Sequence, residues 1–398
     1  MSKEFFSLKL SEIADVVAGQ SPESIYYSNI EGVPFLQGNR TFGTLYPSID
    51  TYTSKVTKLA KKDEVLMSVR APVGDLNFAP CDLCIGRGLA SIKAKDGNNK
   101  FIYYALKYNI NNLLRQGSGT TFDSVNKDVI NDFELILPKD KADRDKVTNI
   151  LSALDSKIEL NNRINAELEA MAKTLYDYWF VQFDFPDEKG KPYKTSGGKM
   201  VWNEELKREI PEGWEVKNLT EEMDLQYGFP FSTELFNDNG IGIPVIRIRD
   251  ILNCSISNYS TEEVDDKYRI NKGDILVGMD GNFHINYWNR DNCYLNQRSL
   301  RIRSSNKSIS EIQARYSIEP FIQAREKNVS RTTVAHLSAK DINDLKILKA
   351  DNEFQNKANT YFNSNLEKIV SNRIQNQKLT ELRDWLLPML MNGQVKVN

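Results

Sequence analysis

The stretch KDEVL at residues 62–66 returns as KGDIL at residues 272–276, an offset of 210 residues (272 minus 62). Other short motifs recur around it in the same order, at offsets of 210 to 212 residues. They are VPFL at 33–36 with IPVI at 243–246, TT at 120–121 with TT at 332–333, VINDF at 129–133 with DINDL at 341–345, and NRI at 162–164 with NRI at 372–374. Chance can explain one such match but not a series in register. The chain of 398 residues is therefore two copies of one unit.

Each copy has the same internal plan. Short apolar runs broken by Gly, Pro, Asn and Asp come first, which is typical of strands joined by loops. A long helix follows, and in the first copy Asp140 is a good N-cap residue for it. The fold class is therefore α+β. The predicted organisation is a mixed α/β domain at 1–139, a helix at 140–180, a linker at 181–210, a second mixed domain at 211–350 and a second helix at 351–393.

Both predicted helices carry a narrow apolar stripe that contains asparagines, and this pattern favours a coiled-coil pair of the two helices. Asparagine in such a seam lowers stability but fixes the register. Helix one leads from the first domain to the second and helix two leads back, so we expect an antiparallel pair and a pseudo-two-fold molecule. The alternative is that each helix packs on its own domain and its asparagines are exposed. The expected seam residues are Leu151, Leu154, Ile158, Asn161, Asn165, Leu168 and Leu175 with Phe362, Ile369, Asn372, Asn376, Leu379 and Leu386.

Composition limits the possible function classes. The 52 Lys and Arg nearly balance the 54 Asp and Glu, which disfavours a wholly basic nucleic-acid binder but allows local basic patches. The longest apolar run, residues 101–106, is too short for a membrane helix, so no membrane association is expected. The N-terminal stretch MSKEFFSLKL lacks a secretory pattern, and we expect a cytoplasmic protein.

The residues that catalysis or cofactor binding would need are missing from the sequence. There is no Walker A motif, and the glycines at 117–119 lack the third glycine of a dinucleotide-binding turn. Cys81 and Cys84 form a single Cys-x-x-Cys pair, whereas a zinc site needs two, so reduced structural thiols are expected. His284 and His336 are expected to be ordinary polar residues. The sequence indicates a recognition protein that binds no cofactor or metal itself.

Four segments carry a resemblance to a known family. They are GSGTT at 117–121, LYDYWFV at 175–181, IPEGW at 210–214 and LLPMLMNGQV at 386–395. Together with the internal repeat, they make the chain resemble the specificity subunits of type I restriction–modification systems.

This resemblance implies two target recognition domains, each reading one half of a bipartite double-stranded DNA target. The two helices would act as a ruler that sets the gap and would dock the modification subunits. The family's subunit is not catalytic. It assembles with two modification subunits, which methylate adenine with S-adenosylmethionine, and with restriction subunits that translocate and cut with ATP and Mg.

Candidate DNA contacts follow from chemistry. Arginine and asparagine read base edges, whereas hydroxyl and backbone N–H groups hold phosphates. The candidates are Arg40, Arg70, Arg87, Ser118, Thr120, Thr121, Arg247, Arg249, Asn282, Arg298, Arg331, Thr332 and Thr333. Arg87 and Arg298 come close to equivalence in the repeat, and the arginine-rich segment 290–331 is the expected electrostatic footprint of the second domain. The alternative is structural: such arginines can tie a strand to a carboxylate, and the Thr-Thr segments can be plain turns.

Two other function classes stay open at this point. One is a two-headed coiled-coil scaffold that binds only proteins, which the near-zero net charge slightly favours. The other is a self-contained methyltransferase, which the missing cofactor-binding turn disfavours.

Overall fold

The structure is a computed structural model that describes residues 5–116, 124–305, 308–327 and 336–395. The chain divides into two compact units. Unit 1 comprises residues 1–160 and 376–398, and unit 2 comprises residues 161–375. Two long helices, α4 (Lys141–Tyr176) and α9 (Asn352–Met391), each contribute one segment to unit 1 and one to unit 2.

Unit 1 is a mixed α/β region followed by the first segment of α4. Its elements are β1 (Phe5–Lys9), α1 (Leu10–Ile13), β2 (Ala14–Ala18), η1 (Ser24–Tyr26), β3 (Tyr27–Ser28), β4 (Val33–Leu36), β5 (Tyr52–Thr53), β6 (Leu59–Ala60), β7 (Val65–Ser68), β8 (Leu76–Phe78), β9 (Leu83–Ile85), β10 (Leu89–Ala94), α2 (Asn99–Gln116), α3 (Lys127–Asp132) and β11 (Glu134–Pro138). One sheet has the order β2-β10-β7-β8, a second has the order β3-β5-β4-β9-β6, and β1 pairs with β11.

Unit 2 repeats this plan after an additional two-stranded sheet at residues 200–211. Its elements between α4 and α9 are η2 (Asp177–Val181, one π-helical turn), β12 (Met200–Asn203), β13 (Arg208–Pro211), β14 (Glu215–Asn218), α5 (Leu219–Glu222), β15 (Met223–Tyr227), η3 (Thr233–Leu235), β16 (Phe236–Asn237), β17 (Ile243–Ile246), α6 (Ile248–Ile251), β18 (Asn258–Ser260), η4 (Asp266–Tyr268), β19 (Arg269–Ile270), β20 (Ile275–Gly278), β21 (Ile285–Tyr287), β22 (Cys293–Leu295), β23 (Ser299–Ser304), α7 (Glu311–Lys327), α8 (Ala339–Asn343) and β24 (Lys346–Lys349). The sheets β15-β23-β20-β21 and β16-β18-β17-β22-β19 correspond to the two larger sheets of unit 1, and β14–β24 corresponds to β1–β11. The prediction of one α+β unit used twice is confirmed.

Strands β7 and β20 contain the repeated KDEVL and KGDIL motifs and lie inside their units. In β7, Val65 and Met67 belong to the core that α2 covers, whereas Leu66 belongs to the core of the second sheet. Successive strand side chains point to opposite faces, and here both faces are covered. Every residue of β7 is therefore buried, and β20 shows the same pattern. Each aliphatic side chain buried in this way stabilises its unit by about 1.5–3 kcal/mol.

The segment predicted as a linker, residues 181–210, is a packed part of unit 2. Phe183 and Phe185 are buried in its core, and the rings of Phe185 and Trp214 stack with centroids 4.8 Å apart. The linker prediction relied on the Gly- and Lys-rich composition of the segment. It overlooked the phenylalanines, whose burial anchors the segment in the core.

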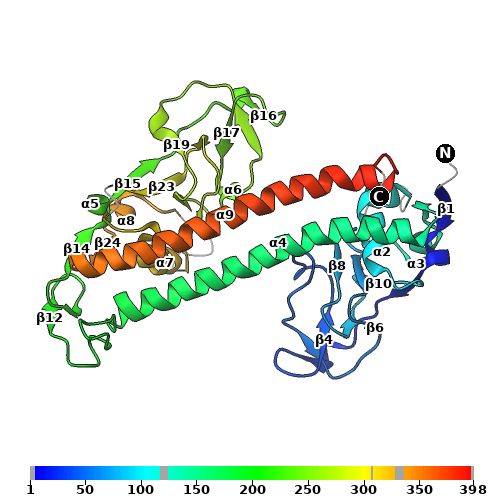
Figure 1. Cartoon of the computed structure of the whole chain (residues 1–398), viewed down its shortest axis with the longest axis horizontal. Coiled ribbons are helices and arrows are strands. Elements are labelled where there is room, and N and C mark those ends of the chain that lie inside the picture. Colours follow the sequence, from blue (N-terminus) through cyan, green and yellow to red (C-terminus); the bar gives the residue numbers. More distant parts are fainter. Residues whose placement is uncertain (1–4, 117–123, 306–307, 328–335, 396–398) are drawn as a thin grey trace. The chain divides into compact units, whose positions relative to one another are not determined.

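Within each unit, the α4 segment lies antiparallel to the α9 segment (Figure 1). In unit 1, the Asn376 amide lies 3.4 Å from the Ile158 carbonyl oxygen. In unit 2, the Asn165 and Asn372 amides are 2.9 Å apart. The asparagines therefore make contacts between the helices, as the paired alternative requires.

The predicted seam residues line these contacts to different depths. Those that are buried are Leu151, Ile158, Asn161, Asn165, Phe362 and Ile369. Those that are partly exposed are Leu154, Leu168, Leu175, Asn372, Asn376, Leu379 and Leu386. In unit 1 a charged pair that the apolar pattern did not suggest lies beside them, because Asp155 is 1% exposed and contacts Arg383 at 2.7 Å. Across the described residues, no helix has the length and hydropathy needed to span a bilayer.

Candidate nucleic-acid interface

Three loops meet at one edge of unit 1, and we call them its loop edge. They are residues 37–51 after β4, residues 69–75 after β7 and residues 86–88 between β9 and β10. Gly88 joins the other two loops, since its N–H donates to the Gln37 carbonyl oxygen at 3.1 Å and its own carbonyl accepts from the Val69 N–H at 2.9 Å. A Cβ atom on Gly88 would lie 2.6 Å from the Gln37 oxygen, so glycine is what permits this approach.

Unit 2 has the same loop edge, formed by residues 247–257, 279–284 and 296–298. The Met279 N–H donates to the Arg298 carbonyl oxygen at 2.9 Å, as the Val69 N–H does to Gly88. Arg298 therefore corresponds to Gly88. The near-equivalence of Arg87 and Arg298 in the sequence is off by one residue, because Arg87 corresponds to Gln297.

The predicted arginines of unit 1 all lie on its loop edge. Arg40, Arg70 and Arg87 are exposed. Arg40 forms an ion pair with Asp50 at 2.7 Å. Among the described residues, no ion pair involves Arg70 or Arg87. Two guanidinium groups at this edge therefore have most of their donors directed at solvent.

The predicted residues of unit 2 also lie on its loop edge. Arg247 and Arg249 flank the start of α6, and the Arg249 guanidinium donates to the Asn258 side-chain oxygen at 2.9 Å. Asn282 is exposed in the loop after β20. Arg298 is exposed and forms an ion pair with Asp280 at 2.9 Å.

The remaining predicted contacts lie outside the described residues, and they are Ser118, Thr120, Thr121, Arg331, Thr332 and Thr333. The first described residues after these two segments are Ser124 and His336. Ser124 forms a backbone bridge with Arg70, and His336 forms one with Asp280. In both units, the chain that follows the predicted phosphate-binding segment therefore joins the loop edge.

The repeat corresponds to a known domain. Residues 3–170 and residues 211–380 each match the family model of the type I restriction modification DNA specificity domain. The chain belongs to this family. The resemblance seen in the sequence is confirmed.

Known specificity subunits are similar to this chain. The chain is 24% identical to the type I restriction enzyme MjaIX specificity subunit of Methanocaldococcus jannaschii, over 99% of this chain and 94% of that protein. A putative MjaX specificity subunit from the same organism is 38% identical over 163 residues, which is 40% of this chain and only 38% of that relative. Among solved structures, the S subunit of a type I restriction–modification system from M. genitalium has the same fold, with a TM-score of 0.62 at 17% identity over 98% of this chain and 97% of that one. None of these relatives supports the scaffold alternative.

Part of the arginine-rich segment of the second specificity domain is held in ion pairs and covered, which narrows the expected footprint over residues 290–331. Arg301 is 4% exposed and contacts Asp224, and Arg303 contacts Asp274 at 2.6 Å. These two arginines are two positions apart on β23 and so point to one face of the sheet, where Asp224 of β15 and Asp274, directly before β20, supply the carboxylates. Arg315 is covered as well, with its guanidinium 4.7 Å from the centre of the Tyr287 ring. Of the described arginines in this segment, Arg298 is the one on the loop edge.

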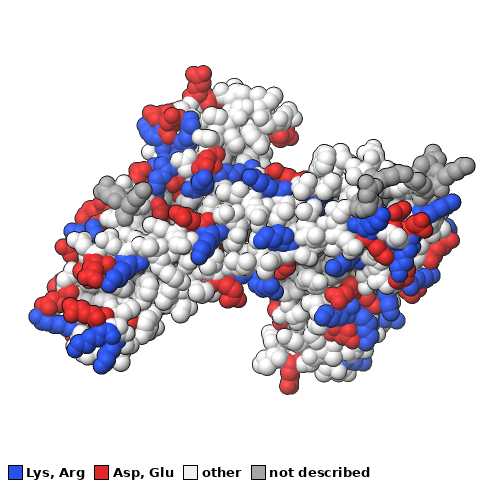
Figure 2. Space-filling model, viewed as in Figure 1, with Lys and Arg blue, Asp and Glu red and all other residues white. Residues whose placement is uncertain are grey.

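Charges on the visible surface of the specificity domains are mixed in sign. Figure 2 shows Lys and Arg side chains interspersed with Asp and Glu over the face drawn. On this face, therefore, positive charge does not gather into one broad patch.

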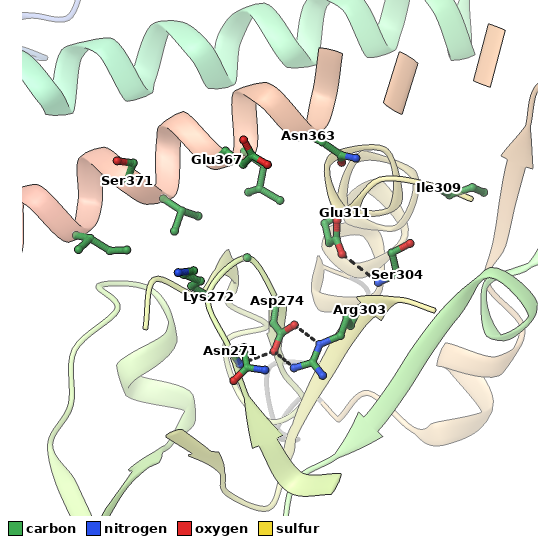
Figure 3. Close-up of a pocket in the computed structure, with 14 residues that line it drawn as sticks. Asn271, Lys272, Asp274, Arg303, Ser304, Ile309, Glu311, Asn363, Glu367 and Ser371 are labelled. Atoms are coloured by element: carbon green, nitrogen blue, oxygen red, sulfur yellow. Dashed lines mark hydrogen bonds and ion pairs between the residues drawn. The ribbon is translucent and has the colours of Figure 1, made fainter. Parts of the chain in front are cut away.

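A cavity of about 750 Å³ in unit 2 lies at the other end of β20 from the loop edge (Figure 3). Asp274 at its wall accepts hydrogen bonds from the Asn271 N–H at 2.7 Å and from Arg303 at 2.6 Å. Glu311 accepts from the Ser304 N–H at 3.0 Å, and burial raises the pKa of its carboxyl. These polar groups hold the turn and the end of β23 in place.

Two residues at the loop edge of unit 2, Asp280 and His336, were not among the predicted DNA contacts. The Nδ1 atom of His336, expected to be an ordinary polar residue, lies 2.6 Å from the Asp280 carboxylate. The repeat could have indicated this contact. Its offsets align Asp280 with Arg70 and His336 with Ser124, and the two residues of each unit form the same backbone bridge.

Proposed function

We propose that this chain is the DNA specificity subunit of a type I restriction–modification complex, and that each unit reads one half of a bipartite double-stranded target. The observation that carries the proposal is the specificity domain occurring twice in one chain, with the same loop edge in both copies. Two copies of one reading surface with different side chains suit a target of two different half-sites.

The loop edges supply the chemistry of base reading. Arginine N–H groups pair with guanine, and an asparagine amide pairs with adenine, in the major groove. Arg70 and Arg87 offer such groups in unit 1, and Asn282 and Arg298 offer them in unit 2. Because the charges nearby are balanced, these groups favour sequence choice over general affinity.

The paired helices are proposed to set the gap between the half-sites. Reading two half-sites from one face of B-DNA requires a separation near one helical turn, about 34–36 Å. The contact between Asn165 and Asn372 restricts the helices to one register. A fixed register gives a fixed gap.

The same helices are proposed to dock two modification subunits. Large apolar side chains that neither unit covers are exposed on them, among them Met171 on α4 and Leu382 and Trp385 on α9, which are 52%, 42% and 56% exposed. Exposed apolar groups on a polar helix are typical of protein–protein contacts. The modification subunits would bring S-adenosylmethionine for adenine methylation, and restriction subunits would bring ATP and Mg. The specificity family is not itself catalytic, so this chain contributes recognition.

Co-expression with a type I modification subunit from the same source, followed by mapping of methylated adenines, tests the proposal. The expected result is methylation confined to one bipartite motif. The modification subunit expressed alone is the control and should modify no such motif. Methylation that does not depend on this chain, or that lacks a bipartite motif, would contradict the proposal.

A further inference from the structure

Three side chains are linked through one carboxylate on the loop edge of unit 2. The Asp280 carboxylate binds the Arg298 guanidinium through one oxygen at 2.9 Å and the Nδ1 atom of His336 through the other at 2.6 Å. An ionised carboxylate only accepts hydrogen bonds, so Nδ1 carries the proton. The Nε2 atom of His336 is then left for another partner.

The network has a defined inner and outer side. The Asp280 side chain is 26% exposed, whereas the Arg298 and His336 side chains are 61% and 51% exposed. The acidic group therefore lies behind, with the Arg298 guanidinium and the Nε2 side of the His336 ring in front. A polyanion approaching this edge meets the Arg298 donors before it meets the carboxylate.

The backbone at Arg298 is held in an uncommon conformation. Its φ angle is +64°, which side chains with a Cβ atom rarely adopt. The Met279 N–H donates to its carbonyl oxygen at 2.9 Å, and the Gln297 N–H donates to Phe229 at 2.8 Å. With its backbone fixed on both sides and its side chain fixed by Asp280, the guanidinium has few alternative positions.

The fold does not need this network. Unit 1 forms the same backbone bonds at the corresponding positions, where the residues are Gly88, Arg70 and Ser124. None of the three side chains of unit 2 has its counterpart there. The backbone bonds between the loops therefore form without these ion pairs. The Asp280 contacts in unit 2 need an explanation other than folding.

We infer that Asp280 is a positioning residue for sequence reading, which holds Arg298 and His336 so that the second specificity domain recognises a base edge through a fixed arginine. The inference rests on the proposed function. A carboxylate that takes one arm of a guanidinium leaves the remaining N–H groups in a fixed plane, which suits the paired acceptors of guanine. It also nearly neutralises the arginine. Arg298→Ala should therefore lower the ratio of cognate to substituted affinity clearly. The slope of binding affinity against salt concentration should change little.

Asp280→Asn tests the inference because positioning and simple electrostatics predict opposite results. The assay uses the complex with its modification subunits, a duplex carrying the mapped motif, and duplexes with single substitutions in either half-site. Positioning predicts that the ratio of cognate to substituted affinity falls by roughly tenfold at one base pair of one half-site. Electrostatics alone predicts tighter binding to all duplexes with that ratio unchanged, because a negative charge near DNA has been removed.

Asp291→Asn is the matched control. Asp291 is an exposed carboxylate of unit 2 at the cavity end of β20, where it accepts from the Lys272 N–H at 3.1 Å. It should leave discrimination unchanged, and the other half-site should be unaffected in every variant. A wild-type complex without a bipartite motif contradicts the proposed function. A wild-type complex with such a motif, but with Asp280→Asn discriminating as well as wild type, overturns the positioning role alone.

Discussion

Asp155 connects α4 to α9 and to α2 within unit 1. It accepts hydrogen bonds from Arg383 at 2.7 Å and from the Tyr104 hydroxyl at 2.6 Å, and it is 1% exposed. Burial, followed by the Asp155 charge, raises the pKa of Tyr104, which keeps the hydroxyl as a donor. Asp155→Ala should lower the free energy of unfolding by about 3–5 kcal/mol, because it breaks the buried ion pair and leaves Arg383 with the exposed carboxylate of Asp384.

Chemical denaturation measures this loss, and Asp384→Ala is its control. Asp384 contacts the same Arg383 at 2.8 Å but is exposed, so its loss should change stability by less than about 1 kcal/mol. Equal losses in the two variants would contradict the assignment.

Glu222 makes stability depend on pH. Burial acts to raise the pKa of its carboxyl, but the hydrogen bond from Ser308 and the ion pair with Lys349 at 2.9 Å outweigh burial and lower it. A carboxyl whose pKa is lower in the folded state stabilises above its unfolded pKa of about 4.3, and this contribution disappears as pH falls through the folded value. Glu222→Gln should therefore be less stable than wild type at pH 7, and the difference should shrink below about pH 4 in denaturation series. A difference that stays constant with pH would show that the charge is not its source.

At the scale of elements, the asparagine contacts between α4 and α9 can be separated from the apolar ones. Asn165 is 7% exposed, and its amide reaches Asn372 at 2.9 Å and the Ile369 carbonyl oxygen at 3.2 Å. Asn165→Ala should cost about 1–3 kcal/mol, since partners lose their hydrogen bonds. Replacing both asparagines by leucine should restore the stability or raise it, because no polar group is then left unpaired. Thermal unfolding compares the variants, with Asn356→Ala on the exposed side of α9 as the control, and a double variant less stable than Asn165→Ala would contradict this account.

The sequence predicts elements better than it predicts side-chain partners. The repeated KDEVL and KGDIL motifs and the helical stripes depend on local periodicity, and α4 and α9 follow those stripes. The partner of Arg301 is Asp224, 77 positions away in the sequence, and no local pattern connects them. Asp280 and His336 are 56 positions apart. Strand order decides both pairings, so the arginines that hold the sheet and the arginine that faces outward look alike until the sheet is built.

For the whole molecule, the net charge of −2 has a specific meaning. Partly buried pairs such as Arg303 with Asp274 use up some of the basic content, and the described loop edges carry a few exposed arginines. A protein of this kind gains little affinity from its overall field, so most of its DNA affinity should come from the complex in which it acts. Its own contribution is the choice of bases and of the distance between them.

That distance is open to direct manipulation, because α4 and α9 each run through both units. Deleting residues 159–165 together with 372–378 removes one heptad from each helix and keeps the seam in phase. The helices shorten by about 10 Å, which corresponds to about three base pairs. Methylation mapping should then show the same two half-sites with a shorter gap. Deleting only one of the two segments is the control, since it removes Asn165 or Asn372 without its partner and leaves the helices unequal in length, which should reduce both stability and methylation. Altered half-sites in the double deletion would mean that the helices take part in base reading, contrary to the ruler role.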